Sequence, residues 1–407
     1  MKHPKTRLSL LMFIQFFIWG ATGPILSLYL RDCLGFSGAQ AGLILGLAAV
    51  SAIVSPALMT FVADRLVSSE RLLALLNAAG GAFMIVFSMQ TRFYPALAAY
   101  ILYNTAMNPT VPLINAITFH HAPARREKFG NIRVWGTVGW IAVAWVFSFW
   151  ILRGGAPDGG AGQNSHLPIL LKVSAITSFI MAAYSLTIPK RKARDHGGRP
   201  PGPPSFFPAA AFRVVAQPRV LALAAITAAI TFVDKFYTVG TAPFLRQSGF
   251  SERGIMPAMS LGQVPEIAAM GILGYLLTRW GAKKVLIAGM ALEIFRFAAC
   301  AFGVGKPIIY ASLSVHGLAY TFTMITAVIC LDGFCGERER SGVHQLFAVM
   351  TSGIGGFLGS YAAGLALDFF AGTGGAVNYT GYWAVPLILS IFIFVTILLA
   401  RTSNHHV

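Results

Sequence analysis

Long apolar stretches dominate this sequence and decide what it can fold into. A helix needs roughly 20 mostly apolar residues to cross a bilayer. Stretches of about that length occur at 8–30, 39–63, 72–89, 95–119, 134–151, 167–188, 220–240, 255–277, 285–302, 307–329, 343–369 and 382–400. Charged residues make up only 11% of the 407 residues, too few for the surface of a soluble domain. The sequence therefore predicts an all-α membrane protein with about twelve transmembrane helices.

The longest polar interruption lies midway along the chain, at 189–219. It is basic and contains the Pro/Gly-rich run that begins at Arg199, a composition typical of a flexible linker. We therefore expect an N-terminal six-helix bundle at 1–188, a cytoplasmic linker at 189–219 and a C-terminal six-helix bundle at 220–407.

The formal net charge of +17 is distributed as membrane topology requires. Lys and Arg fall in the short gaps between apolar stretches, and mostly in every second gap, which is the positive-inside pattern. They form no continuous stripe with interleaved aromatic residues, as a nucleic-acid groove would need. The pattern predicts a multi-pass protein of the cell (inner) membrane, with both termini and the linker in the cytoplasm.

Several ionisable side chains lie inside predicted spans, where a charge costs at least about 2.5–3.5 kcal/mol at the helix centre. Glu266 lies inside the eighth span, three residues after Gln263, so the two share one helix face. Such a carboxyl can exchange protons or bind substrate. The alternative is a permanent ion pair with Arg133, Lys235 or Arg296.

The other intramembrane charges have two interpretations each. Asp234 and Lys235 are adjacent in the seventh span and point about 100° apart, so only one can face a given point. His316 can relay protons or simply pack through a hydrogen bond. Glu293 and Arg296 are three residues apart, which favours a local ion pair of structural importance.

The fifth span presents a mixed polar and aromatic face. Arg133, Thr137 and Trp140 recur at i, i+4 and i+7 and therefore lie on one side of the helix. A cation, a hydroxyl and a flat ring suit a ligand with a ring and several hydroxyls. The alternative is that Arg133 caps the helix end and Trp140 packs.

Catalytic and nucleotide-hydrolysing motifs are missing from the sequence. It has no Walker A loop, no HExxH, no GxSxG and no metal-spaced His/Cys cluster. We therefore expect no enzyme activity and no cofactor, and transport coupled to an ion gradient. A receptor without transport activity is disfavoured because no sizeable soluble domain exists to signal.

The loop from Gly274 to Lys284, Gly-Tyr-Leu-Leu-Thr-Arg-Trp-Gly-Ala-Lys-Lys, resembles the G-x-L-x-x-R-x-G-x-K loop of the major facilitator superfamily. Within that superfamily the chain looks like the bacterial nucleoside:proton symporters. The matching pieces begin at Phe13 (Phe-Ile-Gln-Phe-Phe-Ile-Trp-Gly), Pro112 (Pro-Leu-Ile-Asn), Arg133 (Arg-Val-Trp-Gly-Thr-Val-Gly), Gln263 (Gln-Val-Pro-Glu) and Arg296 (Arg-Phe).

The resemblance implies a proton-coupled symporter that imports nucleosides by alternating access through two pseudo-symmetric bundles. The proton is then the coupling ion, the partners are a small solute and the lipid bilayer, and a monomer suffices. On this basis the predicted substrate-binding residues are Arg133, Thr137, Trp140, Tyr237, Thr238, Gln263, Glu266, Tyr320 and Thr321, and the predicted proton-coupling residues are Asp234, Glu266 and His316.

The sequence departs from the family pattern at two places. Asp234 and Lys235 stand where the family has polar amides on the seventh helix, and Thr321 follows Tyr320 where the family has an acidic residue. Asp234 or His316 could assume that acidic role. A sugar, an aromatic acid or an exported drug stays an alternative substrate.

Overall fold

The computed structural model describes residues 4–65, 68–121, 129–149, 166–189, 209–303, 305–336 and 339–400. Helices account for nearly all of these residues, and the β-structure among them is one isolated bridge between Ala371 and Val377. Most of the predicted linker, 190–208, and the basic cluster at 125–128 lie outside the described ranges.

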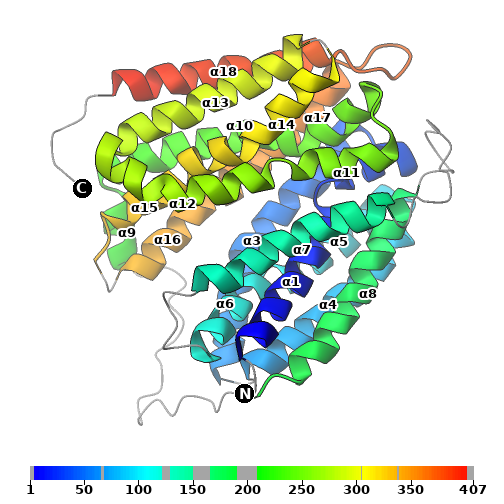
Figure 1. Ribbon diagram of the computed structural model, residues 1–407, viewed down its shortest axis with the longest axis vertical. Helices are drawn as coiled ribbons and strands as arrows, with labels where there is room; N and C mark the ends of the chain where they lie inside the picture. The colour runs from blue at the N-terminus through cyan, green and yellow to red at the C-terminus, as the bar shows by residue number, and fades with distance from the viewer. Residues whose placement is uncertain are drawn as a thin grey trace. The chain divides into compact units, whose positions relative to one another are not determined.

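The helices follow the predicted apolar stretches along the whole chain (Figure 1). Up to the linker they are α1 (Pro4–Thr22), α2 (Leu26–Leu28), the π-helical turn η1 (Tyr29–Cys33), α3 (Gly38–Arg65), α4 (Ser69–Ser88), α5 (Phe93–Met107), α6 (Thr110–His121), α7 (Phe129–Phe149) and α8 (Leu167–Leu186). After it they are α9 (Ala209–Val215), α10 (Pro218–Gln247), α11 (Glu252–Ser260), α12 (Gln263–Trp280), α13 (Ala282–Phe302), α14 (Lys306–Tyr320), η4 (Thr321–Ile325), α15 (Thr326–Asp332), α16 (Arg340–Ala348), η5 (Val349–Gly355), α17 (Gly356–Phe369) and α18 (Tyr379–Leu399).

The described part of the chain contains ten helical segments that are long and apolar enough to cross a membrane. Helix α3, whose residues Gly38–Ser51 form a shorter apolar segment, and the pair α5 and α6 cover the two remaining predicted stretches. The all-α membrane class is confirmed, whereas the total of twelve spans stays a prediction.

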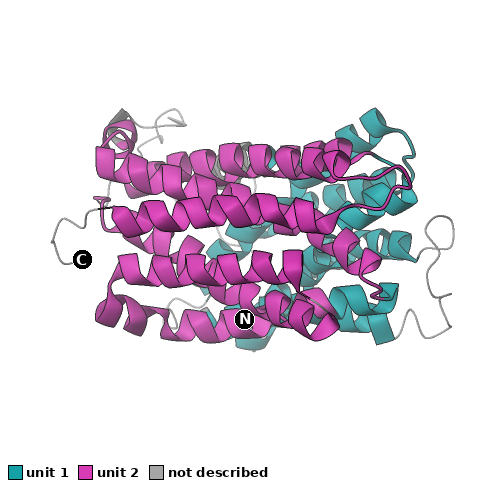
Figure 2. Cartoon of the chain, turned by 90° about the horizontal axis from the view of Figure 1, so that it is seen from above, with its two compact units in different colours: residues 1–36, 50–205, 251–257 teal, residues 37–49, 206–250, 258–407 magenta. Residues whose placement is uncertain are grey.

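Contacts between Cα atoms group the chain into two compact units (Figure 2). Unit 1 comprises residues 1–36, 50–205 and 251–257, and unit 2 comprises residues 37–49, 206–250 and 258–407. In unit 1, α1 packs against α7 and α8, and α4 packs against α5 and α8. In unit 2, α13 packs against α14 and α18, and α10 packs against α17. The division into two six-helix bundles at the linker stays a prediction.

Besides the stretch at 8–30, which breaks at 23–25 between α1 and α2, two of the predicted spanning stretches are interrupted. The stretch at 95–119 breaks at Asn108 and Pro109, between α5 and α6, and the stretch at 255–277 breaks at Leu261 and Gly262, between α11 and α12. Proline has no N–H for the preceding turn, and Pro109 and Pro265 lie at or just after these breaks. The second break places Gln263 and Glu266 in the first turn of α12.

A single glycine connects α12 to α13. Gly281 has φ +78°, a left-handed conformation that side chains with a Cβ rarely adopt. This tight reversal lies in the loop that resembles the superfamily motif. The left-handed backbone at Gly281 explains why this position of the motif is a glycine in this chain.

Residues 38–49 of α3 pack closely against α17 within unit 2. The carboxylate of Asp368 accepts hydrogen bonds from the backbone N–H groups of Gly38 and Ala39, at 2.6 and 2.8 Å. A Cβ at Gly46 would lie 3.0 Å from the Phe357 ring. Glycine therefore allows the two backbones to approach, and Asp368 satisfies N–H groups that a helix start leaves unpaired.

Candidate functional site

Arg133 and Trp140 of α7 both lie against α1 in unit 1. The guanidinium carbon of Arg133 is 4.0 Å from the centroid of the Phe16 ring, a cation–π contact. A Cβ at Gly23 would be 3.1 Å from the Trp140 ring, so this glycine leaves the space that the indole occupies. Thr137 lies between them in sequence and is half-buried.

The glycines of the Arg-Val-Trp-Gly-Thr-Val-Gly segment are explained by the same packing. Added Cβ atoms at Gly136 and Gly139 would collide with Phe16 and with the backbone of Phe13, both on α1. The segment therefore requires glycine to bring α7 onto α1, and this approach fixes where Arg133 and Trp140 point.

Unit 1 also contains buried polar groups that were not predicted as site residues. Gln15 on α1 is fully buried, and neither of its amide atoms has a hydrogen-bond partner within the described residues. The same holds for Nε1 of Trp19, Nδ2 of Asn108 and Oδ1 of Asn115. Each unpaired buried group costs about 1–3 kcal/mol, so these atoms are suited to bind water or a polar ligand.

A charged cluster lies in the interior of unit 2, where α10, α13 and α14 meet. Its centre is Arg296, whose side chain is 0% exposed. The guanidinium pairs with the carboxylate of Glu293 on the same helix and lies 3.5 Å from the carboxylate of Asp234. The predicted local pair between Glu293 and Arg296 is confirmed, but Arg296 also connects it to Asp234.

His316 joins the cluster from α14. An Arg296 N–H donates to Nδ1 of His316, and the same nitrogen is 3.9 Å from the Asp234 carboxylate. The Tyr237 ring contacts both groups. Its centroid is 4.2 Å from that of the imidazole, on which it stacks, and 4.4 Å from the Arg296 guanidinium carbon. Asp234 and Tyr237, from the predicted stretch 220–240, and His316, from the stretch 307–329, therefore come together around Arg296.

Asp234 and Lys235 point in different directions, as their adjacency on a helix requires. Asp234 faces Arg296 and His316. The Lys235 side chain runs past η5 and α17, where its Cε would be 3.5 Å from a Cβ at Gly356. Its ammonium interacts electrostatically with Asp234. The carboxylate, and not the ammonium, therefore belongs to the cluster.

Glu266 is connected to this cluster through α14. The start of α12 crosses α14 at two glycines, because a Cβ at Gly317 would collide with the Gly262 carbonyl and lie 2.6 Å from the Glu266 Cβ. Tyr320, one turn further along α14, interacts electrostatically with both Asp234 and Glu266. Gln263 precedes Glu266 by three residues and is half-buried.

The remaining predicted residues take less central positions. The Thr238 hydroxyl lies 3.5 Å from the backbone carbonyl of Asp234. Thr321 is fully buried in η4, and its hydroxyl has no partner within the described residues. Arg133, Thr137 and Trp140 belong to unit 1, whereas all the other predicted site residues belong to unit 2.

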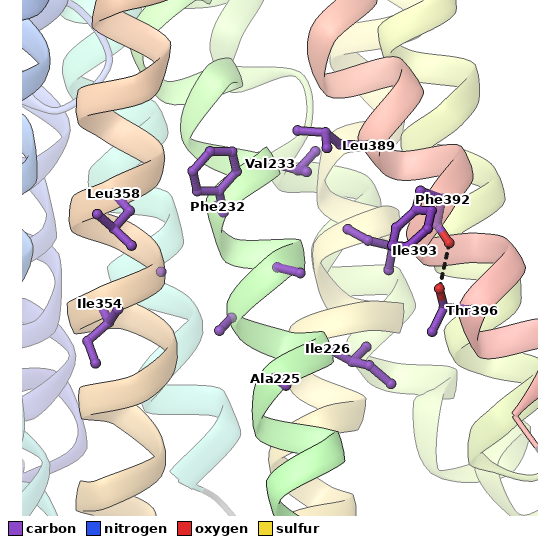
Figure 3. A pocket seen from close by; sticks show the side chains of 13 residues that line it. Ala225, Ile226, Phe232, Val233, Ile354, Leu358, Leu389, Phe392, Ile393 and Thr396 are labelled. Carbon is purple, nitrogen blue, oxygen red and sulfur yellow. Dashed lines mark hydrogen bonds between the residues drawn. The ribbon is translucent and has the colours of Figure 1, made fainter.

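An apolar pocket of about 520 Å³ lies elsewhere in unit 2, between α10, α17 and α18 (Figure 3). Its lining includes Phe232, Leu358 and Phe392, and the one hydroxyl in it, on Thr396, donates to the Phe392 carbonyl. A polar solute would find no free donor or acceptor among these side chains, so this pocket is not the substrate site.

The family model of nucleoside H⁺ symporters matches residues 1–406, nearly the whole chain. The chain belongs to the nucleoside H⁺ symporter family. Similar proteins include the putative nucleoside transporter YegT of Escherichia coli, 27% identical over 98% of this chain and 95% of the relative. The xanthosine permease of the same organism is 26% identical over 98% and 96%.

The fold agrees with this family. The crystal structure of the nucleoside transporter NupG superimposes with a TM-score of 0.86 at 22% sequence identity, over 98% of this chain and 100% of that chain. A symporter family and transporter relatives confirm that the protein is a multi-pass transporter with the major facilitator fold, and not an enzyme.

Proposed function

We propose that this protein imports nucleosides together with protons by alternating access. The family match over nearly the whole chain supports the reaction type. The relatives' printed names, a putative nucleoside transporter and a xanthosine permease, support the solute class. The observation that carries the proton coupling is the buried cluster of Asp234, Glu293, Arg296 and His316 in unit 2.

The predicted substrate contacts fit a nucleoside chemically. Trp140 offers a flat ring for the base, and base–aromatic stacking contributes about 1–3 kcal/mol. Arg133, Thr137, Gln263 and Glu266 offer donors and acceptors for the base edge and the ribose hydroxyls. Tyr237, Thr238, Tyr320 and Thr321 complete the proposed set, and Glu266, Asp234 and His316 are the proposed proton-coupling groups.

One proton for each nucleoside provides enough free energy for accumulation. A single charge that crosses about 100 mV releases about 2.3 kcal/mol, and each 1.4 kcal/mol corresponds to about a tenfold ratio. A neutral nucleoside can therefore be concentrated about 50-fold by this potential alone.

Uptake of radiolabelled nucleosides tests the proposal in cells that lack their own nucleoside carriers. We expect accumulation that a protonophore abolishes, and no accumulation of labelled sugars or aromatic acids. If cells that display the protein in their membrane accumulate no nucleoside, the proposed function is wrong. Accumulation of a sugar, an aromatic acid or a drug would instead identify a different solute for the same fold.

We also propose that the protein works as a monomer in the inner membrane, with both termini in the cytoplasm. The alternation of Lys and Arg between successive gaps supports this orientation.

A further inference from the structure

The cluster around Arg296 contains more negative than positive charge. Two carboxylates, Asp234 and Glu293, lie within 4 Å of one guanidinium. His316 adds no positive charge in this arrangement. Because an arginine N–H can only donate, Nδ1 of His316 must accept, so the imidazole is neutral with its proton on Nε2. These four groups together carry one net negative charge, and the Lys235 ammonium, outside the cluster, acts on its Asp234 side.

The two carboxylates differ in how well their charge is supported. Asp234 is 16% exposed and faces Arg296, His316 and the electrostatic field of Lys235. Glu293 is 3% exposed, and the cation beside it is Arg296, which it shares with Asp234. Glu293 is less exposed to water and has fewer cations nearby, so its ionised form costs more free energy than that of Asp234. A proton added to the cluster is therefore favoured on Glu293.

The other titratable groups near the cluster do not change this balance. Tyr237 stacks on His316, contacts Arg296 with its ring face and is neutral at physiological pH. The Cys300 thiol lies 3.1 Å from the Ser312 hydroxyl. Tyr320 lies towards Asp234 and Glu266, and Glu266 itself approaches α14 at Gly317.

We propose that Glu293 is the acid that takes up the transported proton, and that Arg296 then passes from Glu293 to Asp234. The proton forms an O–H bond on the Glu293 carboxylate, which removes the ion pair on α13. Arg296 then neutralises Asp234, and the stacked Tyr237 and His316 move with it. Release of the proton restores the first pairing. This inference rests on the proposed symport and refines its proton-coupling set. Glu293 takes the transported proton in place of Glu266, which then only contacts the nucleoside, while Asp234 and His316 act through Arg296.

The Glu293→Gln variant tests this assignment because glutamine imitates the protonated, neutral acid. We expect it to bind nucleosides and to exchange internal for external nucleoside without a proton gradient. Accumulation driven by a pH gradient should be lost, and nucleoside affinity should no longer change with pH. Glu339→Gln, which lies outside the cluster, is the matched control and should accumulate nucleosides like the unmodified protein. A Glu293→Gln protein that accumulates as well as this control overturns the assignment.

Two further measurements keep the proposal testable if Glu293→Gln fails to fold or if no nucleoside binds. Glu293→Asp keeps a carboxyl and should shift the pH midpoint of accumulation, so an unchanged midpoint would contradict the proposal. Infrared difference spectra of the unmodified protein need no substrate. They should show the carbonyl stretch of a buried carboxylic acid that grows as pH falls and that persists in Glu266→Gln. If that band disappears in Glu266→Gln, Glu266 is the proton carrier and Glu293 is not. Failure of the unmodified protein to bind any nucleoside would refute the proposed function while leaving this spectroscopic test valid.

Discussion

Arg296 shows most clearly how single residues determine both stability and function. Its guanidinium supplies hydrogen bonds to Glu293 and His316 and lies between the aromatic rings of Tyr237 and Phe297. A lysine could not replace it, because only the planar guanidinium presents several fixed donors together with a face that stacks. The sequence revealed the pair with Glu293 from its i, i+3 spacing. The connection to Asp234 and His316 could not be predicted, because it depends on how α10 and α14 meet α13.

We predict that Arg296→Met destabilises the protein by about 3–5 kcal/mol near neutral pH. The substitution leaves the buried Glu293 carboxylate without its cation and leaves Asp234 with Lys235 as its remaining cation. The loss should become smaller as pH falls, because protonation removes the uncompensated charges. Chemical unfolding in detergent over a pH series measures both effects. The triple variant Arg296→Met, Glu293→Gln, Asp234→Asn is the control and should regain most of the lost stability. A loss that does not depend on pH would contradict this charge account.

Trp140 carries the prediction for the substrate side. Trp140→Ala should weaken nucleoside binding by about 5- to 150-fold, since base stacking contributes about 1–3 kcal/mol. Trp140→Phe keeps an aromatic face and should retain most of the affinity. Calorimetric titration of the purified variants measures the change. Equal affinity for Trp140→Ala and the unmodified protein would favour the alternative in which Trp140 only packs against Gly23.

At the scale of helices, sequence reasoning located the apolar stretches but not their internal breaks. The apolar stretch at 255–277 predicts one helix, whereas in the structure α11 ends at Ser260 and α12 begins at Gln263. Periodicity and hydropathy are averaged over windows of about 11–18 residues, so they do not detect a break of one turn. The π-helical turns η4 and η5 could not be predicted for the same reason. The break matters because it places Glu266 in a first helical turn beside α14.

The crossing of α12 and α14 gives a sharp test of that placement. Gly317→Ala puts a Cβ against the rigid Gly262 carbonyl and 2.6 Å from the Glu266 Cβ, so the two helices must separate. We expect nucleoside affinity to fall at least about tenfold, which corresponds to 1.4 kcal/mol, while the protein stays folded.

Gly271→Ala on α12 is the matched control, because nothing lies within 4 Å of its added Cβ. It should leave affinity unchanged and stabilise the helix by roughly 0.5–1 kcal/mol. If both alanine variants bind nucleosides like the unmodified protein, the crossing does not position Glu266.

At the scale of the whole molecule, the all-α membrane class was predictable from composition and from the positions of the apolar stretches and basic residues. A chain with 56% hydrophobic residues and basic residues in alternating gaps has few other solutions. The identity of the solute could not be predicted in the same way. It depends on a few side chains, and the acidic residue that the family has after its tenth-helix aromatic is Thr321 here. The resemblance of the Arg133 segment therefore predicted the family, while composition and spacing predicted only a transporter.

Cys33 and Cys335 test the proposed orientation. Cys33 is the last residue of η1 and of the first span, and Cys335 lies between the spans Lys306–Asp332 and Arg340–Phe369. With cytoplasmic termini, a membrane-impermeant maleimide should label Cys33 from outside and Cys335 only in inverted vesicles. Burial raises the pKa of the Cys335 thiol, so its labelling should accelerate as the solution becomes more alkaline. Labelling of Cys335 from outside would reverse the topology.

The central claim is that the movement of a nucleoside and of a proton is one event. Purified protein in liposomes tests it directly, with an imposed inward nucleoside gradient and a pH-sensitive dye inside. Our account predicts that the interior acidifies as nucleoside enters, and that Glu293→Gln admits nucleoside without acidification. Entry of nucleoside through the unmodified protein without any change of internal pH would contradict it.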